Sequence, residues 1–211
     1  MLDNIPRAIV WMNVVVLVAG AAAVIATANA EFGFYLAALV TITFGVLMLH
    51  RRVGLSTGVL TALSLWSAAH LIGGLVPVPR GWPYQGDTPV MYSAWIVPEV
   101  IKYDNVVHAF GFGTCVVVCH QSIRCVIGHA ADHPGVIALC VLAACGLGGV
   151  NEIVEFVATR ISPDTNVGGY VNTALDLVAN AAGAGAVGIL LAVRKFEPDA
   201  GSSDPEARGP G

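Results

Sequence analysis

Six apolar stretches occupy most of this chain of 211 residues, and they constrain its fold more than any other feature. An α-helix needs about 20 apolar residues to cross roughly 30 Å of hydrocarbon, and each stretch approaches that length. They lie at about 8–28, 33–49, 53–76, 104–123, 135–159 and 171–193. We therefore expect an all-α membrane protein, a polytopic bundle of about six transmembrane helices.

The composition agrees with this fold class. Charged residues make up 11% of the chain, against about 25% in a typical soluble domain, and mean hydropathy is +0.74. The spans and their short links fill 1–195, so we expect one membrane domain, with the acidic segment 196–211 as a disordered cytoplasmic tail. The expected partner is the lipid bilayer of the cell (inner or plasma) membrane. Nothing indicates nucleic acid binding, and the oligomeric state is left open.

The cysteines are expected to pack as apolar side chains and not to take part in redox chemistry or metal binding. Their number is odd and no two of them form a CxxC pair, so neither a disulfide framework nor a metal motif is indicated. We expect them to act as small apolar residues in the fourth and fifth spans. They are Cys115, Cys119, Cys125, Cys140 and Cys145.

Basic residues orient the chain, because cytoplasmic loops are enriched in Lys and Arg. With both termini cytoplasmic, the inner side carries Arg7, Arg51, Arg52, Arg124, Arg194 and Lys195, and the outer side carries Arg80, Lys102 and Arg160. One rival reading is a signal peptide cleaved after Ala28-Asn29-Ala30. The apolar run before this motif is longer than the usual 7–15 residues, which favours a retained first span.

In this orientation, six ionisable side chains lie near the outer ends of the last four spans. An ionisable group in hydrocarbon costs several kcal/mol unless it is paired, hydrated or bound, so a group of them indicates a polar site inside the bundle. At 1.5 Å per residue, each lies within about 10 Å of the outer boundary. They are His70, Asp104, His108, Glu152, Glu155 and Asp176.

Two pairs on single helices carry most of this prediction. Asp104 and His108 share a helical face at i, i+4, where the carboxylate can orient the imidazole for proton transfer or metal binding. The alternative for Asp104 is a favourable interaction with the helix dipole. Glu152 and Glu155, at i, i+3, cannot both ionise comfortably without a positive partner such as His70, His108, Arg160 or a divalent metal. The alternative is a structural ion-pair network.

The sixth span adds a polar stripe. Asn172, Asp176 and Asn180 recur at i, i+4, i+8 and should face the bundle interior, with Asp176 as the site candidate and the two asparagines as hydrogen-bonding partners between helices. Small residues on the same span predict close helix packing. These are Ala179, Gly183, Gly185 and Gly188.

The outer loops are less informative. Residues 77–102 contain Trp82, Tyr84, Tyr92 and Trp95 among several prolines, which is typical of an aromatic belt at headgroup level and leaves open a lid over the site. The segment Asp164-Thr165-Asn166 predicts a turn, with a place at the mouth of the site as the alternative.

The combination of these motifs resembles the YjdF-like family of inner-membrane proteins. The resemblance covers spans three to six and rests on four elements: His70-x-x-Gly73-Gly74, Tyr103-Asp104-x-x-x-His108, Glu152-x-x-Glu155-Phe156 and Thr173-x-x-Asp176-Leu177. More distantly, Asp104, His108, Glu152, Glu155, Arg160, Asp176, Asn180 and Gly183 look like the pattern of VanZ-like proteins.

This resemblance implies a polytopic membrane protein of the cell envelope, and in VanZ-like relatives a link to glycopeptide resistance, without an established activity. An Asp commonly precedes the Thr of the last element in the family, and this chain has Asn172 there. That departure weakens any two-metal site.

Three classes of function follow from these residues. The first is a metal-dependent or acid–base hydrolase or transferase acting on a lipid or lipid-linked envelope substrate, with zinc, iron or manganese as the ion. His70, His108, Glu152 and Asp176 would then hold the metal, Glu155 would move a proton and Asp104 would orient His108. Arg160, Asn172 and Asn180 would support the site.

The second class is a proton- or cation-coupled transporter or binding protein, which uses the same carboxylates. The absence of an internal repeat and of polar residues leading to the cytoplasmic half argues mildly against it. The third class is a non-catalytic envelope protein whose polar network locks helix packing.

Overall fold

Six long helices form the molecule, and each is long and apolar enough to cross a membrane. The computed structural model describes residues 5–27, 30–86, 89–161 and 169–194. The helices are α1 (Arg7–Thr27), α2 (Ala30–Val53), α3 (Thr57–Leu75), α4 (Tyr103–Ile127), α5 (Pro134–Ile161) and α6 (Tyr170–Arg194). The expected all-α fold with about six transmembrane helices is confirmed.

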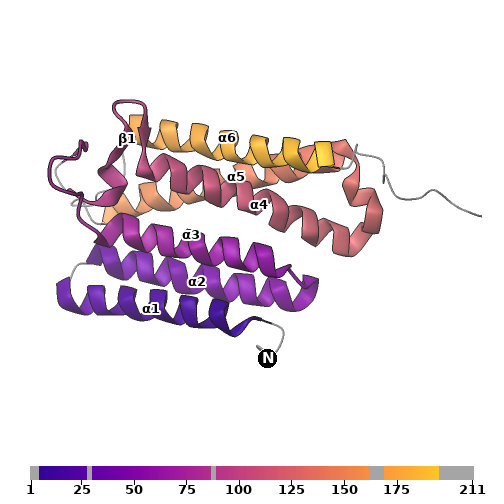
Figure 1. Cartoon of the computed structure of the whole chain (residues 1–211), viewed down its shortest axis with the longest axis horizontal. Helices are drawn as coiled ribbons and strands as arrows, with labels where there is room; N and C mark the ends of the chain where they lie inside the picture. The colour runs from indigo at the N-terminus through magenta and orange to yellow at the C-terminus, as the bar shows by residue number, and fades with distance from the viewer. Residues whose placement is uncertain (1–4, 28–29, 87–88, 162–168, 195–211) are drawn as a thin grey trace, which may run out of the picture.

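The helices run nearly parallel to one long axis and form two groups (Figure 1). One group contains α1, α2 and α3, and the other contains α4, α5 and α6. The two groups meet mainly where α3 packs against α4, and α4 also packs against α5 and α6. Helix α4 is therefore the centre of the bundle. The first helix begins and the last ends at the same end of the molecule (Figure 1).

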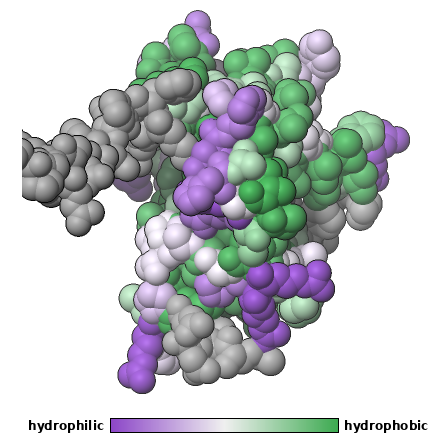
Figure 2. Space-filling model, turned by 90° about the vertical axis from the view of Figure 1, so that its right-hand side faces the viewer, coloured by the Kyte–Doolittle hydropathy of each residue, from purple (hydrophilic) through white to green (hydrophobic). Residues whose placement is uncertain are grey.

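Large apolar side chains cover the sides of the bundle. Trp11, Leu142 and Val178 each expose about two thirds of their surface. Such a surface is unfavourable in water and suits contact with lipid. Figure 2 looks onto the end where α2 joins α3 and α4 joins α5, and hydrophilic side chains gather there. This end carries the exposed Arg51, Arg52 and Arg124, so it is the one that the charge distribution assigns to the cytoplasm.

The junction between α2 and α3 differs from the predicted span limits. The predicted second span, 33–49, is shorter than α2, and the predicted third span, 53–76, begins four residues too early. Gly54 has a φ of +69°, a conformation that glycine adopts without strain, and it ends α2. Ser56 then caps α3 by accepting a hydrogen bond from the Val59 backbone N–H.

We expect Ser56→Ala to lower stability by about 1 kcal/mol, because an N-cap hydroxyl satisfies an otherwise unpaired N–H. Ser56 Oγ also accepts a hydrogen bond of 2.9 Å from the Gln121 side chain, which ties α3 to α4. Thermal unfolding in detergent measures the change. Ser122→Ala is the matched control, since its hydroxyl bonds only to Val118 O within α4. An equal loss in both variants would contradict the capping role.

Helices α4 and α6 approach each other at a glycine. A Cβ added to Gly183 would lie 1.9 Å from the Ala109 carbonyl oxygen, so only glycine fits there. A Cβ at Gly188 would lie 2.4 Å from the Val141 side chain of α5, whereas a Cβ at Gly185 would meet nothing within 4 Å. Cys140 is buried in the apolar cluster between α4, α5 and α6, against which Cys115, Cys119 and Cys145 pack. Gly183, Gly188 and these four cysteines thus serve packing, whereas Gly185 has no close neighbour and Cys125 is exposed, contrary to the prediction that it packs.

The connection from α3 to α4 is a compact loop and not an open link. It contains the short helix η1 (Met91–Ser93) and two antiparallel strands, β1 (Trp95–Val97) and β2 (Ile101–Lys102). The strands pair Trp95 with Lys102 and Val97 with Ile101. A further short helix, η2 (Gly128–Asp132), joins α4 to α5 at the opposite end. The loop therefore covers the outer end of the bundle beside α3 and α4 (Figure 1).

Three sequence predictions lie outside the described residues. They concern the turn Asp164-Thr165-Asn166, the tail 196–211 and the cleavage motif at 28–30, of which the structure describes only the helical backbone of Ala30.

Candidate functional site

His108 lies at the centre of a polar cluster formed by α4, α5 and α6. Its Nδ1 is 3.1 Å from Asn180 Oδ1 and 3.5 Å from Glu152 Oε1. Its Nε2 is 3.5 Å from Asp104 Oδ1 and 3.9 Å from Glu155 Oε1. The imidazole is 2% exposed. The i, i+4 spacing places Asp104 one turn before His108 on α4, toward the outer end.

Both ring nitrogens of His108 therefore face oxygen atoms. A neutral imidazole has one N–H, so its other nitrogen would point a lone pair at oxygen lone pairs. The arrangement is favourable if the ring carries a second proton, if a protonated carboxyl group donates to the unprotonated nitrogen, or if a cation lies between that nitrogen and the carboxylates. The cluster therefore calls for a further proton or a cation.

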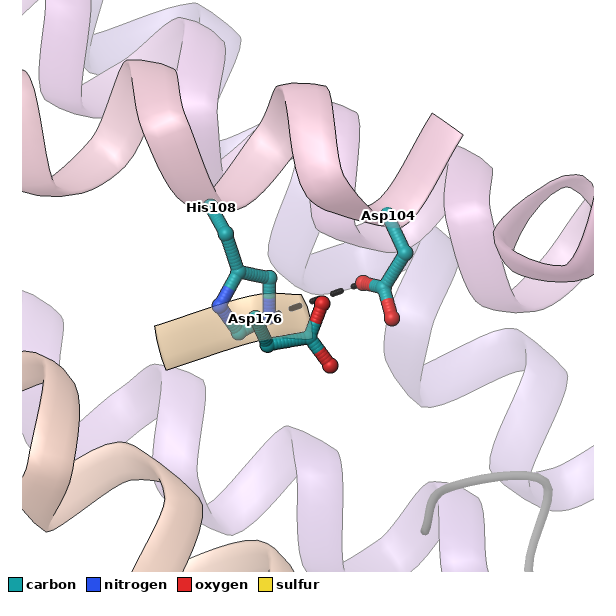
Figure 3. A group of neighbouring side chains, drawn as sticks. All are labelled: Asp104, His108 and Asp176. Carbon is teal, nitrogen blue, oxygen red and sulfur yellow. Dashed lines mark ion pairs between the residues drawn. The ribbon is translucent and has the colours of Figure 1, made fainter. Parts of the chain in front are cut away.

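Asp176 of α6 is held in place by two amides. Its Oδ1 accepts a hydrogen bond of 2.8 Å from Asn105 Nδ2, and its Oδ2 accepts one of 2.7 Å from Asn172 Nδ2. Asn172 Oδ1 in turn accepts a hydrogen bond from the Lys102 ammonium. Asp176 is fully buried. Figure 3 shows its carboxyl group beside the His108 ring, on the same side of the ring as the carboxyl group of Asp104.

The two glutamates of α5 have different surroundings. Glu155 accepts a hydrogen bond of 2.7 Å from Asn151 Nδ2. Glu152 is 4% exposed, and neither of its carboxylate oxygens has hydrogen-bond geometry with a described residue. Buried polar atoms in proteins are nearly always hydrogen-bonded, and the partners near enough to serve these oxygens are the Asn151, Asn180 and His108 side chains or a bound ion. Asn180 Nδ2 also lacks a partner among the described residues.

The residues form two groups of three that share His108. One contains Asp104, His108 and Asp176, and the other contains His108, Glu152 and Glu155. In each group the candidate ligand atoms lie within 4.8 Å of one another. Two ligands at about 2.1 Å from one zinc ion are at most about 4.2 Å apart, so both groups are slightly wider than a loaded site. Imidazole and carboxylate suit zinc, iron or manganese.

His70 and Arg160 lie outside these two groups. His70 Nδ1 is 2.5 Å from the Tyr92 hydroxyl, and its ring centroid is 6.3 Å from that of His108. It therefore borders the cluster from α3, and its assignment as a metal ligand stays a prediction. Arg160 is exposed at the end of α5 and makes no ion pair with a carboxylate of the described residues. Asn172 and Asn180 do contact the cluster.

Sequence reasoning missed four residues that shape this site. Asn105 and Lys102 hold Asp176 and Asn172, Asn151 holds Glu155, and Tyr92 holds His70. Asn105 and Asn151 had a detectable signal, because each is a polar residue in a span next to a predicted site residue. Tyr92 was named only as part of the aromatic outer loop that leaves open a lid over the site, and its contact with His70, 22 residues away, had no signal of its own.

A cavity of about 390 Å³ lies beside the cluster and is bounded mainly by α1, α2 and α3. At one end it reaches His70, Tyr92, Asp104 and Glu155. From there it runs toward the opposite end of α3 and reaches Leu60. Most of its lining is aliphatic, with a polar pair at mid-depth, where Asn13 donates a hydrogen bond of 2.6 Å to Ser64 Oγ.

The inner end of this cavity is closed by apolar side chains. Ile5, Ile9, Leu55, Val59 and Leu60 form a buried cluster there. The Asn13–Ser64 pair is a polar feature that the sequence reading did not anticipate. The apolar cluster below it nevertheless gives no polar route to the inner end through the described residues.

Comparison with known proteins places the chain in a family. No curated protein and no solved structure gives a significant match. A family model described as "Predicted membrane protein (DUF2238)" matches residues 8–196. This range includes every site residue discussed above and all six helices, except for Arg7 at the start of α1. This description mentions neither YjdF-like nor VanZ-like proteins. By this match, the chain belongs to the DUF2238 family of predicted membrane proteins.

Proposed function

We propose that this protein is a membrane-embedded metalloenzyme, a hydrolase or transferase that acts on a lipid or lipid-linked substrate at the outer face of the cell membrane. The observation that carries the proposal is the buried Glu152 carboxyl group, whose oxygens have no partner at strict hydrogen-bond geometry among the described residues, next to a histidine whose two nitrogens both face oxygen. A divalent ion satisfies both features.

In this proposal His108 and Glu152 bind the ion, and Asp176 completes its ligands once the side chains move slightly closer together, while Glu155 moves a proton. The asparagines around Asp176 fix its orientation, as hydrogen-bonded partners commonly do for metal-binding carboxylates. The ion would supply a Lewis acid and an activated nucleophile where bulk water is scarce. Asp104 and Glu155 also line the cavity, so they are the groups placed to exchange a proton with a substrate there.

Glu155→Gln tests this catalytic role. We expect turnover to fall by about 10²–10⁴-fold, the usual contribution of a general acid or base, with the bound metal retained. The assay incubates the purified, metal-loaded protein in vesicles of its native polar lipids and follows lipid mass by mass spectrometry. Glu99→Gln, an exposed glutamate of the outer loop, is the control for loss of one negative charge.

Two results of this assay, and one from a parallel measurement of ion flux, would count against the proposal. Unchanged lipid turnover in Glu155→Gln would exclude that role for Glu155, and no lipid conversion by the metal-loaded wild type would exclude the lipid enzyme. A change in ion flux across sealed vesicles, without lipid conversion, would favour the proton- or cation-coupled transporter.

A further inference from the structure

We propose that the cavity between α1, α2 and α3 holds one hydrocarbon chain of a membrane lipid whose head group carries no net negative charge and reaches the His108 cluster. This inference rests on the proposed function and specifies its class of substrate. It depends on three properties of the cavity: its shape, the charge at its polar end, and an unpartnered polar atom in its wall.

The shape fits a single chain. The α3 residues that line the cavity run from Leu60 to Leu75, a span of roughly 22 Å at 1.5 Å per residue. One leaflet is about half of the roughly 30 Å hydrocarbon thickness, so the cavity is deep enough for a chain that enters from the outer leaflet and passes the midplane. Its volume of about 390 Å³ lies within the range of small-molecule sites.

The charge at the polar end restricts the head group. Asp104 and Glu155 are the charged residues among those described that line the cavity, and no Lys or Arg lines it. One divalent ion neutralises only two of the four carboxylates in the cluster. The Lys102 ammonium, which is bonded to Asn172 and lies 5.7 Å from the centre of the Trp95 ring, offsets part of the charge of Asp104 but does not line the cavity. A carboxylate that stays ionised at this end repels an anionic head group and accepts a neutral or cationic one.

The wall of the cavity also carries a free polar atom. Ser67 lines the cavity between Ser64 and His70 on α3, and its buried hydroxyl has no hydrogen-bond partner among the described residues. Because hydroxyls in hydrocarbon normally find a partner, rotation of the Ser67 side chain toward the cavity would let its hydroxyl bond to an ester or hydroxyl group of a ligand. The hydrocarbon chain of the lipid gains no hydrophobic free energy when it moves from the bilayer into the cavity. The preference for one lipid over another therefore depends on packing and on these polar contacts.

Quenching of Trp66 fluorescence tests the inference, since this ring lines the cavity. The probe protein keeps Trp66 and carries Trp11→Phe, Trp82→Phe and Trp95→Phe. It is reconstituted into phosphatidylcholine vesicles with chain-brominated phosphatidylethanolamine or phosphatidylglycerol. We expect the ethanolamine lipid to reach half-maximal quenching at a lipid fraction about fivefold lower than the glycerol lipid. Repulsion between two unit charges about 4 Å apart gives a factor of this size even in water.

Filling the cavity should abolish this selectivity. We expect Ser67→Phe to bring both lipids to the same quenching curve, whereas Leu65→Phe, on the exposed side of the same helix, should leave the fivefold difference in place. Ala38→Phe fills the cavity from α2 and replaces Ser67→Phe if that variant does not fold. Equal quenching by the two lipids in the parent protein, or a preference for the glycerol lipid, would overturn the inference.

Metal content measured on the same samples separates this inference from the proposed function. A metal-free parent protein that still selects the ethanolamine lipid would overturn the metalloenzyme and support the lipid site. A metal-loaded parent protein without selectivity would overturn the lipid site and leave the metalloenzyme standing.

Discussion

Glu152→Gln is expected to remove the bound divalent ion and to destabilise the metal-loaded protein, although the new side chain has almost the same size. An ion that binds only the folded state stabilises it by about 2.7 kcal/mol at one hundred times its dissociation constant. Glu152 is the ligand with two oxygens available, so its loss should remove most of that stabilisation. Thermal unfolding in detergent, with and without added metal, measures the effect.

Chelation supplies the control for this prediction. If Glu152 binds the ion, the wild type and Glu152→Gln should have nearly equal stability after chelator treatment. The variant can even be the more stable of the two, because a buried carboxylate has been replaced by a neutral group. Glu99→Gln should match the wild type throughout. A loss of the same size before and after chelation would show instead that Glu152 is part of a structural ion pair with His108.

Gly183→Ala is the second substitution for which we expect a large effect. The added methyl group would lie 1.9 Å from a backbone oxygen of α4, which cannot move aside as a side chain can. Overpacking costs about 1–3 kcal/mol and occasionally more, and we expect at least about 3 kcal/mol here because α4 and α6 must separate. The separation would also move Asp176 and Asn180 away from His108, so metal affinity should fall with stability.

Gly185→Ala is the matched control two residues along the same helix. Nothing lies within 4 Å of the added Cβ, and alanine is the better helix former by about 1 kcal/mol. We therefore expect unchanged or slightly higher stability and unchanged metal content. If both variants behaved alike in unfolding and in metal binding, the close contact between α4 and α6 would be refuted.

The fold was predictable because its determinants are local. Each span is visible as an apolar run, and alternation of direction brings the outer ends of spans three to six together without any knowledge of packing. The helical period then places His108 one turn from Asp104 and puts Asp176 and Asn180 on one face. The limits of α2 and α3 were less accurate, because the conformation of Gly54 and the cap at Ser56 determine them.

The remaining features of the site depend on tertiary contacts. The hydrogen bond between Tyr92 and His70 joins the outer loop to α3, and no repeating pattern in the sequence predicts it. Asn105 faces Asp176 because of how α4 rotates against α6, which the contact at Gly183 controls. The cavity likewise arises between three helices whose lining residues look individually like ordinary lipid-facing positions. Sequence reasoning thus gave the chemistry of the site and not its neighbours.

Elemental analysis of the detergent-purified protein, beside the double variant Glu152→Ala, His108→Ala, tests the central claim most directly. The account predicts about one equivalent of zinc, iron or manganese in the wild type and loss of at least nine tenths of it in the double variant, with Glu99→Gln unchanged. Absence of metal from wild-type protein that was purified without chelator and supplied with each of these ions would contradict the account.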